Sequence, residues 1–255
     1  MQKIKILLIF SLGICLSIFG ETSNPPIPTT AQSASPHASA MHDPEYGSII
    51  YVGPIWNYVT SKWGNGKKQQ GSLGGVVGGY FYIAPNAVFF NAEFDYTSGI
   101  LKGSAGNDPT QEYVTELKLG YSFSLAQNKL LVTPFVGGGS YIIHQSLSHH
   151  LDFNSYFWYT PIGLAGTYHL NSHWTIGLIG FGAPTFGGRW KEHHSDKAST
   201  KPLWKVEFPL IYLGSLPFEL AIIPFATGWG FHKSGDLVAQ NNTYYGMRLA
   251  FAYHF

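Results

Sequence analysis

The chain is poor in cysteine, in charged residues and in long apolar segments. Its single cysteine, Cys15, lies in an N-terminal apolar segment, and once that segment is removed no thiol remains for a disulfide, for catalysis or for a metal site. Charged residues make up 11% of the chain, against about 25% in ordinary soluble domains. Beyond the N-terminus, no segment reaches the about 18 consecutive apolar residues of a transmembrane helix. A helical membrane protein is therefore excluded, and an ordinary soluble domain is disfavoured.

Aromatic residues and glycine are abundant instead. Aromatic side chains make up 16% of the 255 residues and 30 residues are glycine, yet the mean hydropathy is only +0.01. Few charges, many rings and middling hydropathy together favour a β-barrel that presents every second residue to lipid. The net charge of +1 gives no global field that would attract nucleic acid, so no nucleic-acid partner is predicted.

The N-terminus predicts export from the cytoplasm. Lys3 and Lys5 precede an apolar stretch over 6–19, which is too short to span a bilayer and has the length of a signal-peptide core. We therefore expect residues 1–20 to be a signal peptide. The Pro/Ser/Thr-rich segment 21–47 lacks periodicity and large apolar residues, which indicates a flexible periplasmic segment.

A lipoprotein signal is the alternative for the same N-terminus. The sequence Leu12-Gly13-Ile14-Cys15 loosely resembles a lipoprotein cleavage box, in which lipid would be attached to Cys15. Such a box requires a small residue directly before the cysteine, and Ile14 is not small. The sequence therefore favours the removable signal peptide.

From residue 48 to residue 255 the chain alternates apolar residues with polar or small ones in long runs. Tight breaks alternate strictly with longer polar breaks, which are predicted to be loops of about ten residues near 61–71, 101–110, 146–153, 191–201 and 233–242. No helix-period segment interrupts the series, so a βαβ fold is excluded. The prediction is ten strands, with eight as the alternative if two of them merge, over 48–60, 72–84, 87–100, 111–124, 130–145, 154–169, 173–190, 202–213, 218–232 and 243–255.

These runs favour an all-β, up-and-down antiparallel transmembrane β-barrel over a soluble sandwich. Strands of soluble proteins average about 5–6 residues, and the runs are twice as long. An even strand count with short turns on one side is typical of outer-membrane barrels. One face of each run is crowded with large rings, which a ten-strand interior cannot hold, so we expect the rings to face lipid and the small or charged residues to face the lumen.

Two segments show a resemblance to a known family. The segment VTPFVGGGSY over 132–141 and the ending GMRLAFAYHF over 246–255, together with the signal peptide and the long strands, resemble small bacterial outer-membrane barrels of the opacity/OmpX-like surface-protein type. The resemblance implies a location in the outer membrane, contact with its lipid and lipopolysaccharide, and a final strand read by the barrel-assembly machinery. The positions to which it assigns this assembly signal are Gly246, Phe251, Tyr253 and Phe255.

Seven charged residues fall on the faces predicted to line the lumen, namely Glu93, Asp95, Glu116, Lys118, Lys205, Glu207 and Arg248. If the strands on either side of 101–110 pair symmetrically, Glu93 faces Lys118 and Asp95 faces Glu116. The second pair needs a cation such as Arg248 or Lys205 reaching across the lumen. Unpaired charges are costly in a dry interior, so the pattern favours a lumen plugged by ion pairs over a polar track for a small solute.

Two loops carry a repeated histidine pattern. HHLD places His149, His150 and Asp152 in one loop, and HHSD places His193, His194 and Asp196 in the next. Imidazole and carboxylate groups bind zinc, copper or nickel, so a metal site at the outer rim is a hypothesis. Because no sharper ligand spacing accompanies the pattern, the overall prediction is that the protein has no cofactor.

Enzyme motifs are missing from the sequence. Ten-strand omptin proteases use acidic pairs and an Asp near a His at the outer rim, whereas Glu93 with Asp95 lies too deep and no Asp-x-His occurs. Ser140 and Ser146 lie near His144 without a nucleophile motif. The sequence thus predicts a barrel without catalytic activity. Its expected role is structural or adhesive, with loops exposed to host or neighbouring molecules, and a narrow channel for small polar solutes is the alternative.

Overall fold

The computed structural model describes residues 47–104, 106–147, 151–191, 195–197, 199–214, 218–232 and 239–255. The expected signal peptide and nearly all of the expected flexible segment lie outside these residues. The histidines of the HHLD and HHSD patterns also lie outside them. Among the described residues, no helix has the length and apolarity needed to cross a membrane.

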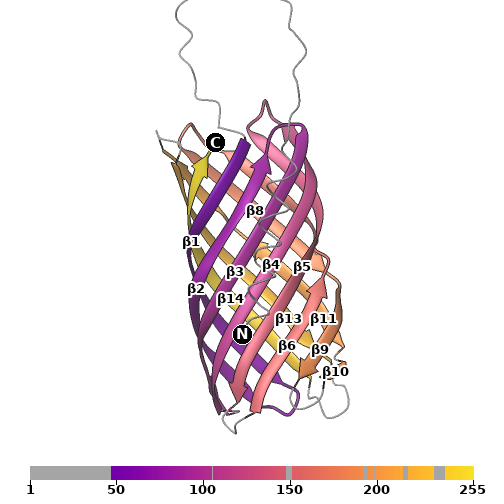
Figure 1. The fold of residues 1–255 in the computed structure, drawn as a ribbon. Helices are drawn as coiled ribbons and strands as arrows, with labels where there is room; N and C mark the ends of the chain where they lie inside the picture. Colours follow the sequence, from indigo (N-terminus) through magenta and orange to yellow (C-terminus); the bar gives the residue numbers. More distant parts are fainter. Residues whose placement is uncertain are drawn as a thin grey trace, which may run out of the picture. The chain divides into compact units, whose positions relative to one another are not determined.

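Fourteen strand segments form one closed antiparallel sheet (Figure 1). The barrel closes where β1 pairs with β14, from Ile49 opposite His254 to Trp63 opposite Gln240. The segments are β1 (Gly47–Trp63), β2 (Lys68–Ile83), β3 (Ala87–Gly103), β4 (Gly106–Leu125), β5 (Leu130–Leu147), β6 (Leu151–Tyr159), β7 (Ile162–His169), β8 (Trp174–Ala183), β9 (Thr185–Lys191), β10 (Ser195–Lys197), β11 (Thr200–Glu207), β12 (Leu210–Leu213), β13 (Phe218–Phe231) and β14 (Gln240–His254).

Proline divides three barrel strands into shorter segments. Pro161 separates β6 from β7, Pro184 separates β8 from β9, and Pro209 separates β11 from β12. Proline has no N–H to donate to the ladder, so pairing lapses at these points and resumes after them. β5 accordingly pairs with both β6 and β7, and β8 pairs with both β11 and β12. When each divided strand is counted once, and β10, which pairs with β9, is counted with β11 and β12, the fourteen segments make ten barrel strands, as predicted, and the eight-strand alternative does not hold.

The connections differ from the prediction on one side of the barrel. The expected loops over 61–71 and 101–110 are mostly strand, because β1 continues to Trp63 and β3 continues to Gly103. The turns on the other side are tight, and Asn86 and residues 126–128 adopt positive φ there. We call the end with these tight turns the turn end, which is uppermost in Figure 1 with the C-terminus, and the opposite end the loop end.

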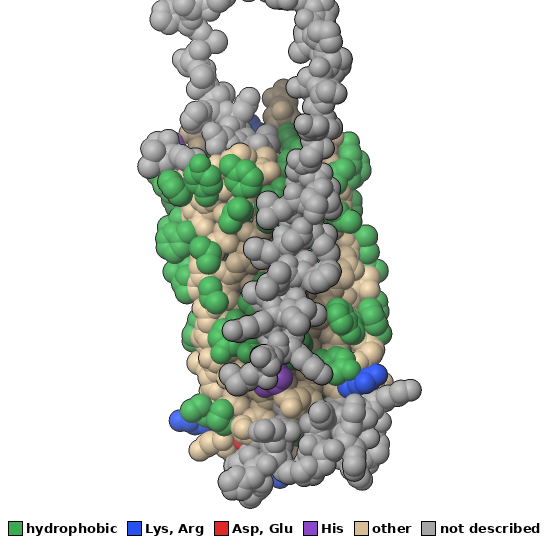
Figure 2. Space-filling model, in the orientation of Figure 1, with side chains coloured by type: hydrophobic (Ala, Val, Ile, Leu, Met, Phe, Trp, Pro, Cys, Tyr) green, Lys and Arg blue, Asp and Glu red, His purple; other side chains and the backbone are tan. Residues whose placement is uncertain are grey.

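The two faces of each strand lie in different surroundings. In β14, Tyr245 and Phe251 are 57% and 58% exposed, whereas Arg248 on the other face is 3% exposed. Large apolar side chains cover much of the outer wall in Figure 2, and lysine and arginine side chains lie near the loop end. A soluble barrel would bury such rings, so this wall has the character of a surface that faces lipid.

Candidate functional site in the barrel lumen

The seven predicted lumen charges all lie inside the barrel. β3 supplies Glu93 and Asp95, β4 supplies Glu116 and Lys118, β11 supplies Lys205 and Glu207, and β14 supplies Arg248. Their side chains are at most 9% exposed. The alternation of each strand directs them inward, and closure of the sheet brings four separate strands around one space.

Arg248 connects three carboxylates across the lumen. Its Nη1 atom lies 3.0 Å from Glu93 Oε1 and 3.1 Å from Glu207 Oε1, and its Nη2 atom donates to Asp95 Oδ2 at 2.9 Å. The guanidinium also lies 5.0 Å from the centre of the Phe225 ring. A planar group with several fixed donors suits this bridging position better than an ammonium would.

Lys205 and Lys118 complete the network. Lys205 Nζ lies 2.9 Å from Glu207 Oε1, 3.4 Å from Glu93 Oε1 and 3.6 Å from Glu116 Oε2. Lys118 Nζ lies 2.6 Å from Glu116 Oε2. Each carboxylate of the network therefore contacts at least one cation. We call these seven residues the ion network.

The predicted pairing of β3 with β4 was wrong by two residues. Glu93 lies opposite Glu116 and Asp95 lies opposite Val114, whereas Lys118 lies opposite Asn91. The expected register assumed a loop over 101–110, but the strands continue until only residues 104 and 105 join them. Because the shift is even, every side chain keeps its face and only its cross-strand partner changes.

Tyrosine hydroxyls form a second set of contacts with the carboxylates. Tyr51 donates to Glu93 Oε2 at 2.6 Å, and Tyr159 donates to Glu116 Oε1 at 2.8 Å. These bonds occupy oxygens that the cations leave open. A buried carboxylate is stable only when its remaining lone pairs are also satisfied, so the tyrosines belong to the same arrangement.

Glu112 of β4 was not among the predicted site residues, and it lies next to the network. It accepts hydrogen bonds from Tyr244 at 2.7 Å, from Tyr141 at 3.0 Å and from Thr97 at 3.4 Å. No described cation forms an ion pair with it. The sequence does place Glu112 on the same face of its strand as Glu116, four residues later. Its three hydrogen-bond partners come from three other strands, so the sequence does not indicate them.

A small cavity lies between Glu112 and the ion network. Its volume open to water-sized molecules is about 40 Å³. Both charged and neutral polar side chains line it, including Asn57, Asp95, Glu112, Lys205, Tyr244 and Arg248. The cavity has room for a very small solute, because about 10–15 Å³ of space measured with a water-sized sphere is enough to hold one water.

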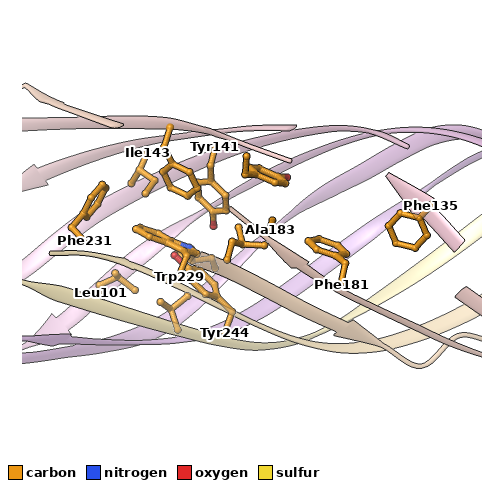
Figure 3. Close-up of a cluster of buried hydrophobic side chains, with 14 of the residues drawn as sticks. Leu101, Phe135, Tyr141, Ile143, Phe181, Ala183, Trp229, Phe231 and Tyr244 are labelled. Atoms are coloured by element: carbon orange, nitrogen blue, oxygen red, sulfur yellow. The ribbon is translucent and has the colours of Figure 1, made fainter. Parts of the chain in front are cut away.

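Apolar side chains fill the lumen around these polar groups. Figure 3 shows Trp229 and Phe231 packed beside Tyr141, with Phe135 and Phe181 farther along the barrel. The Trp229 and Phe157 ring centres are 5.3 Å apart. Lys118 Nζ lies 5.5 Å from the centre of the Phe181 ring. The ion network is therefore in contact with the aromatic pair Phe135 and Phe181.

Polar groups recur at both ends of the lumen. Toward the loop end, Gln69 donates to Asp108 and Gln240 donates to Ser61. At the turn end, His254 Nε2 lies 2.7 Å from Glu219 Oε1. The described lumen is thus packed along its length with paired polar and apolar side chains rather than lined by solvated charges.

The remaining predicted site residues are distributed as follows. Phe251, Tyr253 and Phe255 face outward near the turn end, whereas Gly246 faces the lumen between Tyr244 and Arg248.

In the metal hypothesis, all four histidines lie outside the described residues, and the described residues contain no group of three acidic, histidine or cysteine side chains able to hold a metal ion. The hypothesis therefore stays a prediction.

The two serines and the histidine considered for catalysis lie outside the lumen, and the Ser140 side chain is half-buried on the outward face of β5. The His144 and Ser146 side chains are exposed on the outward face of β5, and His144 Nδ1 contacts Asn154 Oδ1 rather than a carboxylate.

No protein-family model matches the chain, and no curated protein matches it. Solved outer-membrane barrels are similar in fold. The translocator domain of the autotransporter NalP from Neisseria meningitidis has a TM-score of 0.51 and 12% sequence identity, over 85% of this chain and 91% of that one. The outer membrane protease OmpT from Escherichia coli has 0.49 and 9%, over 85% and 100%. An outer membrane channel from Pseudomonas putida F1 has 0.43 and 13%, over 86% and 99%. The similarity to the translocator domain shows the fold alone.

Proposed function

We propose that the protein is an integral outer-membrane surface barrel, of the opacity/OmpX-like kind, whose lumen is closed by the ion network. The observation that carries this proposal is Arg248, which contacts carboxylates from β3 and β11 while it belongs to β14. Three well-separated strands are thereby joined through the centre of the lumen. Such a network fills the space through which a solute would otherwise pass.

A narrow channel is the second candidate. The cavity of about 40 Å³ beside the network favours it, because it provides space for a small polar solute inside the barrel. The two candidates differ in one measurable property. A channel conducts ions through the unaltered purified protein, whereas a closed lumen does so only after the ion network has been altered.

Planar-bilayer conductance of the refolded barrel separates the two candidates. We expect the unaltered protein to be electrically silent. Arg248→Ala should produce discrete conductance steps, because it removes the bridging group and leaves carboxylates that attract water. Arg189→Ala is the matched control, since Arg189 is exposed near the loop end, and it should stay silent. Steady conductance of the unaltered protein would favour the channel, and silence of Arg248→Ala would contradict the plug.

We further propose that the loop end binds lipopolysaccharide phosphates. Six cations are wholly or partly exposed toward this end, whereas every acidic side chain that the structure describes faces the lumen; the six are Lys62, Lys67, Lys68, Lys102, Arg189 and Lys201. A surface charge of one sign attracts phosphate. The β1–β2 and β3–β4 connections are too short to form separate binding loops, so an adhesive role is proposed for this rim as a whole.

Lipopolysaccharide binding can be tested with the lysines of the β1–β2 connection. Lys67→Gln with Lys68→Gln should weaken co-sedimentation of the barrel with lipopolysaccharide, because two exposed charges are lost at the rim. Lys129→Gln, at an exposed lysine of the turn end, is the control and should leave the binding unchanged. Equal binding by all three proteins would contradict a role for the rim.

β14 is the proposed contact with the barrel-assembly machinery. Its outward rings reach Phe255, whose N–H bonds to the Ser48 carbonyl beside the start of β1. Deleting Phe255 should reduce the amount of folded barrel in cells while leaving refolding in detergent intact. We propose no catalytic role for the barrel, because the two serines and the histidine considered for one belong to the outer wall.

A further inference from the structure

We propose that the cavity beside Glu112 binds one small monovalent cation through oxygen atoms of Glu112, Asn57 and Asp95. This inference goes beyond the closure of the lumen, and it requires only the fold and the cavity. The ligand would be a sodium, potassium or ammonium-type ion with little or no hydration shell, held inside the barrel between β1, β3 and β4.

The charge of the lumen favours a cation. Three carboxylates, Asp95, Glu112 and Glu116, line the cavity, against the two cations Lys205 and Arg248. With all five groups ionised the sum is −3 + 2 = −1. Excess charge of one sign is costly in a low-dielectric interior and is lowered by an opposite charge placed nearby.

Glu112 is the cavity carboxylate that forms no ion pair with a described cation. Arg248 and Lys205 each contact three other carboxylates, and Lys118 contacts Glu116. Glu112 is only 3% exposed and is held by hydroxyl groups instead. Arg248 and Lys205, which also line the cavity, are therefore already paired with other carboxylates. This pairing limits their repulsion of a bound ion.

Buried oxygen atoms beside Glu112 have no donor. Asn57 is 6% exposed and its Oδ1 atom has no hydrogen-bond partner among the described residues, and the same is true of Asp95 Oδ1. Both residues line the cavity. A buried acceptor without a donor is destabilising, so two of them beside a carboxylate favour the binding of a cation at this place.

The kind of cation follows from the ligands and the space. The oxygens are hard ligands, which suit alkali and alkaline-earth ions rather than zinc or copper. A divalent site needs several carboxylates close together, and no group of three metal-binding acidic, histidine or cysteine side chains occurs among the described residues. About 40 Å³ suits an ion or ammonium group that has shed most of its water.

Gly246 keeps space open beside this cavity. A Cβ atom at this position would lie 2.5 Å from Phe225 Cζ and 2.8 Å from Asn57 Oδ1. A methyl group here would therefore collide with Phe225 and Asn57, which both line the cavity.

The experiment measures the temperature at which the refolded barrel changes to its unfolded gel migration. Sodium, potassium, ammonium and methylammonium chlorides are compared with choline chloride at equal ionic strength, because choline is too large for the cavity. At least one small cation should raise the midpoint by about 2–4 °C over choline when it is present at several times its Kd. Equal midpoints in all salts would mean that the cavity holds water alone, and would overturn the proposal.

Two variants at the site and one control variant assign the effect to this site. Glu112→Gln keeps the shape and removes the charge, so the cation-specific rise should disappear, whereas Glu219→Gln, at the turn end, should retain it. Asn57→Asp adds a carboxylate at the proposed site and should enlarge the rise. An unchanged rise in Glu112→Gln, or no enlargement in Asn57→Asp, would overturn the proposal. Neither result bears on conductance, so failure here is distinct from failure of the proposed function.

Discussion

Adjacent residues of β4 lie in opposite surroundings. Leu117 is 52% exposed on the outer wall, whereas Glu116, one residue earlier, is 2% exposed in the lumen. The outer wall needs only apolar side chains of suitable size, because lipid offers no specific partner. The lumen needs particular partners at particular distances, since each buried charge is stable only beside its counterion. A substitution should therefore be costly for different reasons on the two faces.

Removing Arg248 should have the largest effect. Arg248→Ala leaves Glu93, Asp95 and Glu207 without their shared cation, and breaking a buried pair in this way costs about 3–5 kcal/mol. The measurement is the free energy of unfolding in denaturant, with the barrel in detergent. Arg189→Ala should stay within about 0.5 kcal/mol of the unaltered protein. Similar losses in both variants would show that the lumen position has no special importance.

A charge on the lipid face should come second. Leu117→Arg places a cation against the hydrocarbon core at a height close to the ion network, and we expect a loss of about 2–4 kcal/mol. Leu125→Arg is the same change on the same face at the turn end of β4, where the loss should be only about 0–1 kcal/mol. The comparison is made by unfolding in lipid vesicles. Equal losses would argue against a depth-dependent lipid face.

The smallest effect concerns a hydroxyl group in the lumen. Tyr244→Phe removes the 2.7 Å hydrogen bond to Glu112 and should cost about 1–3 kcal/mol, since a buried acceptor loses its donor. Tyr245→Phe, one residue later on the outer wall, should change stability by less than about 0.5 kcal/mol. If the two variants unfold alike, Glu112 does not depend on this hydroxyl.

The outer wall was predictable from the sequence, but most contacts inside the lumen were not. The exception is the expected cation reaching across to Asp95 or Glu116, since Arg248 lies 2.9 Å from Asp95 and Lys205 lies 3.6 Å from Glu116. Alternation alone sets the face of every residue, which is why the large rings of each run were correctly expected to point outward. The cross-strand partner of each residue depends on the register of the two strands. The β3–β4 register was mispredicted because the connection is two residues long, whereas the sequence suggested a longer loop. The contacts of Arg248 with Glu93 and of Glu112 with Tyr244 join strands far apart in the sequence, so no local pattern indicates them.

Continuity of the strands was also only partly predictable. The runs over 154–169, 173–190 and 202–213 were expected to be unbroken, and each contains a proline where pairing lapses. Pro134 and Pro224 lie within strands that stay continuous, with their rings on the outer face. A proline in the sequence therefore marks a possible break, and the neighbouring strands decide whether the break occurs.

Tryptophan fluorescence tests the division between wall and lumen most directly. Two single-tryptophan proteins are compared, one that keeps Trp204 on the outer wall and one that keeps Trp229 in the lumen, with the other tryptophans replaced by phenylalanine. Brominated lipids should quench Trp204 strongly, and neither brominated lipids nor aqueous acrylamide should quench Trp229. Quenching of Trp229 by lipid would contradict the orientation of the strands, and quenching of Trp229 by acrylamide would contradict the closed lumen.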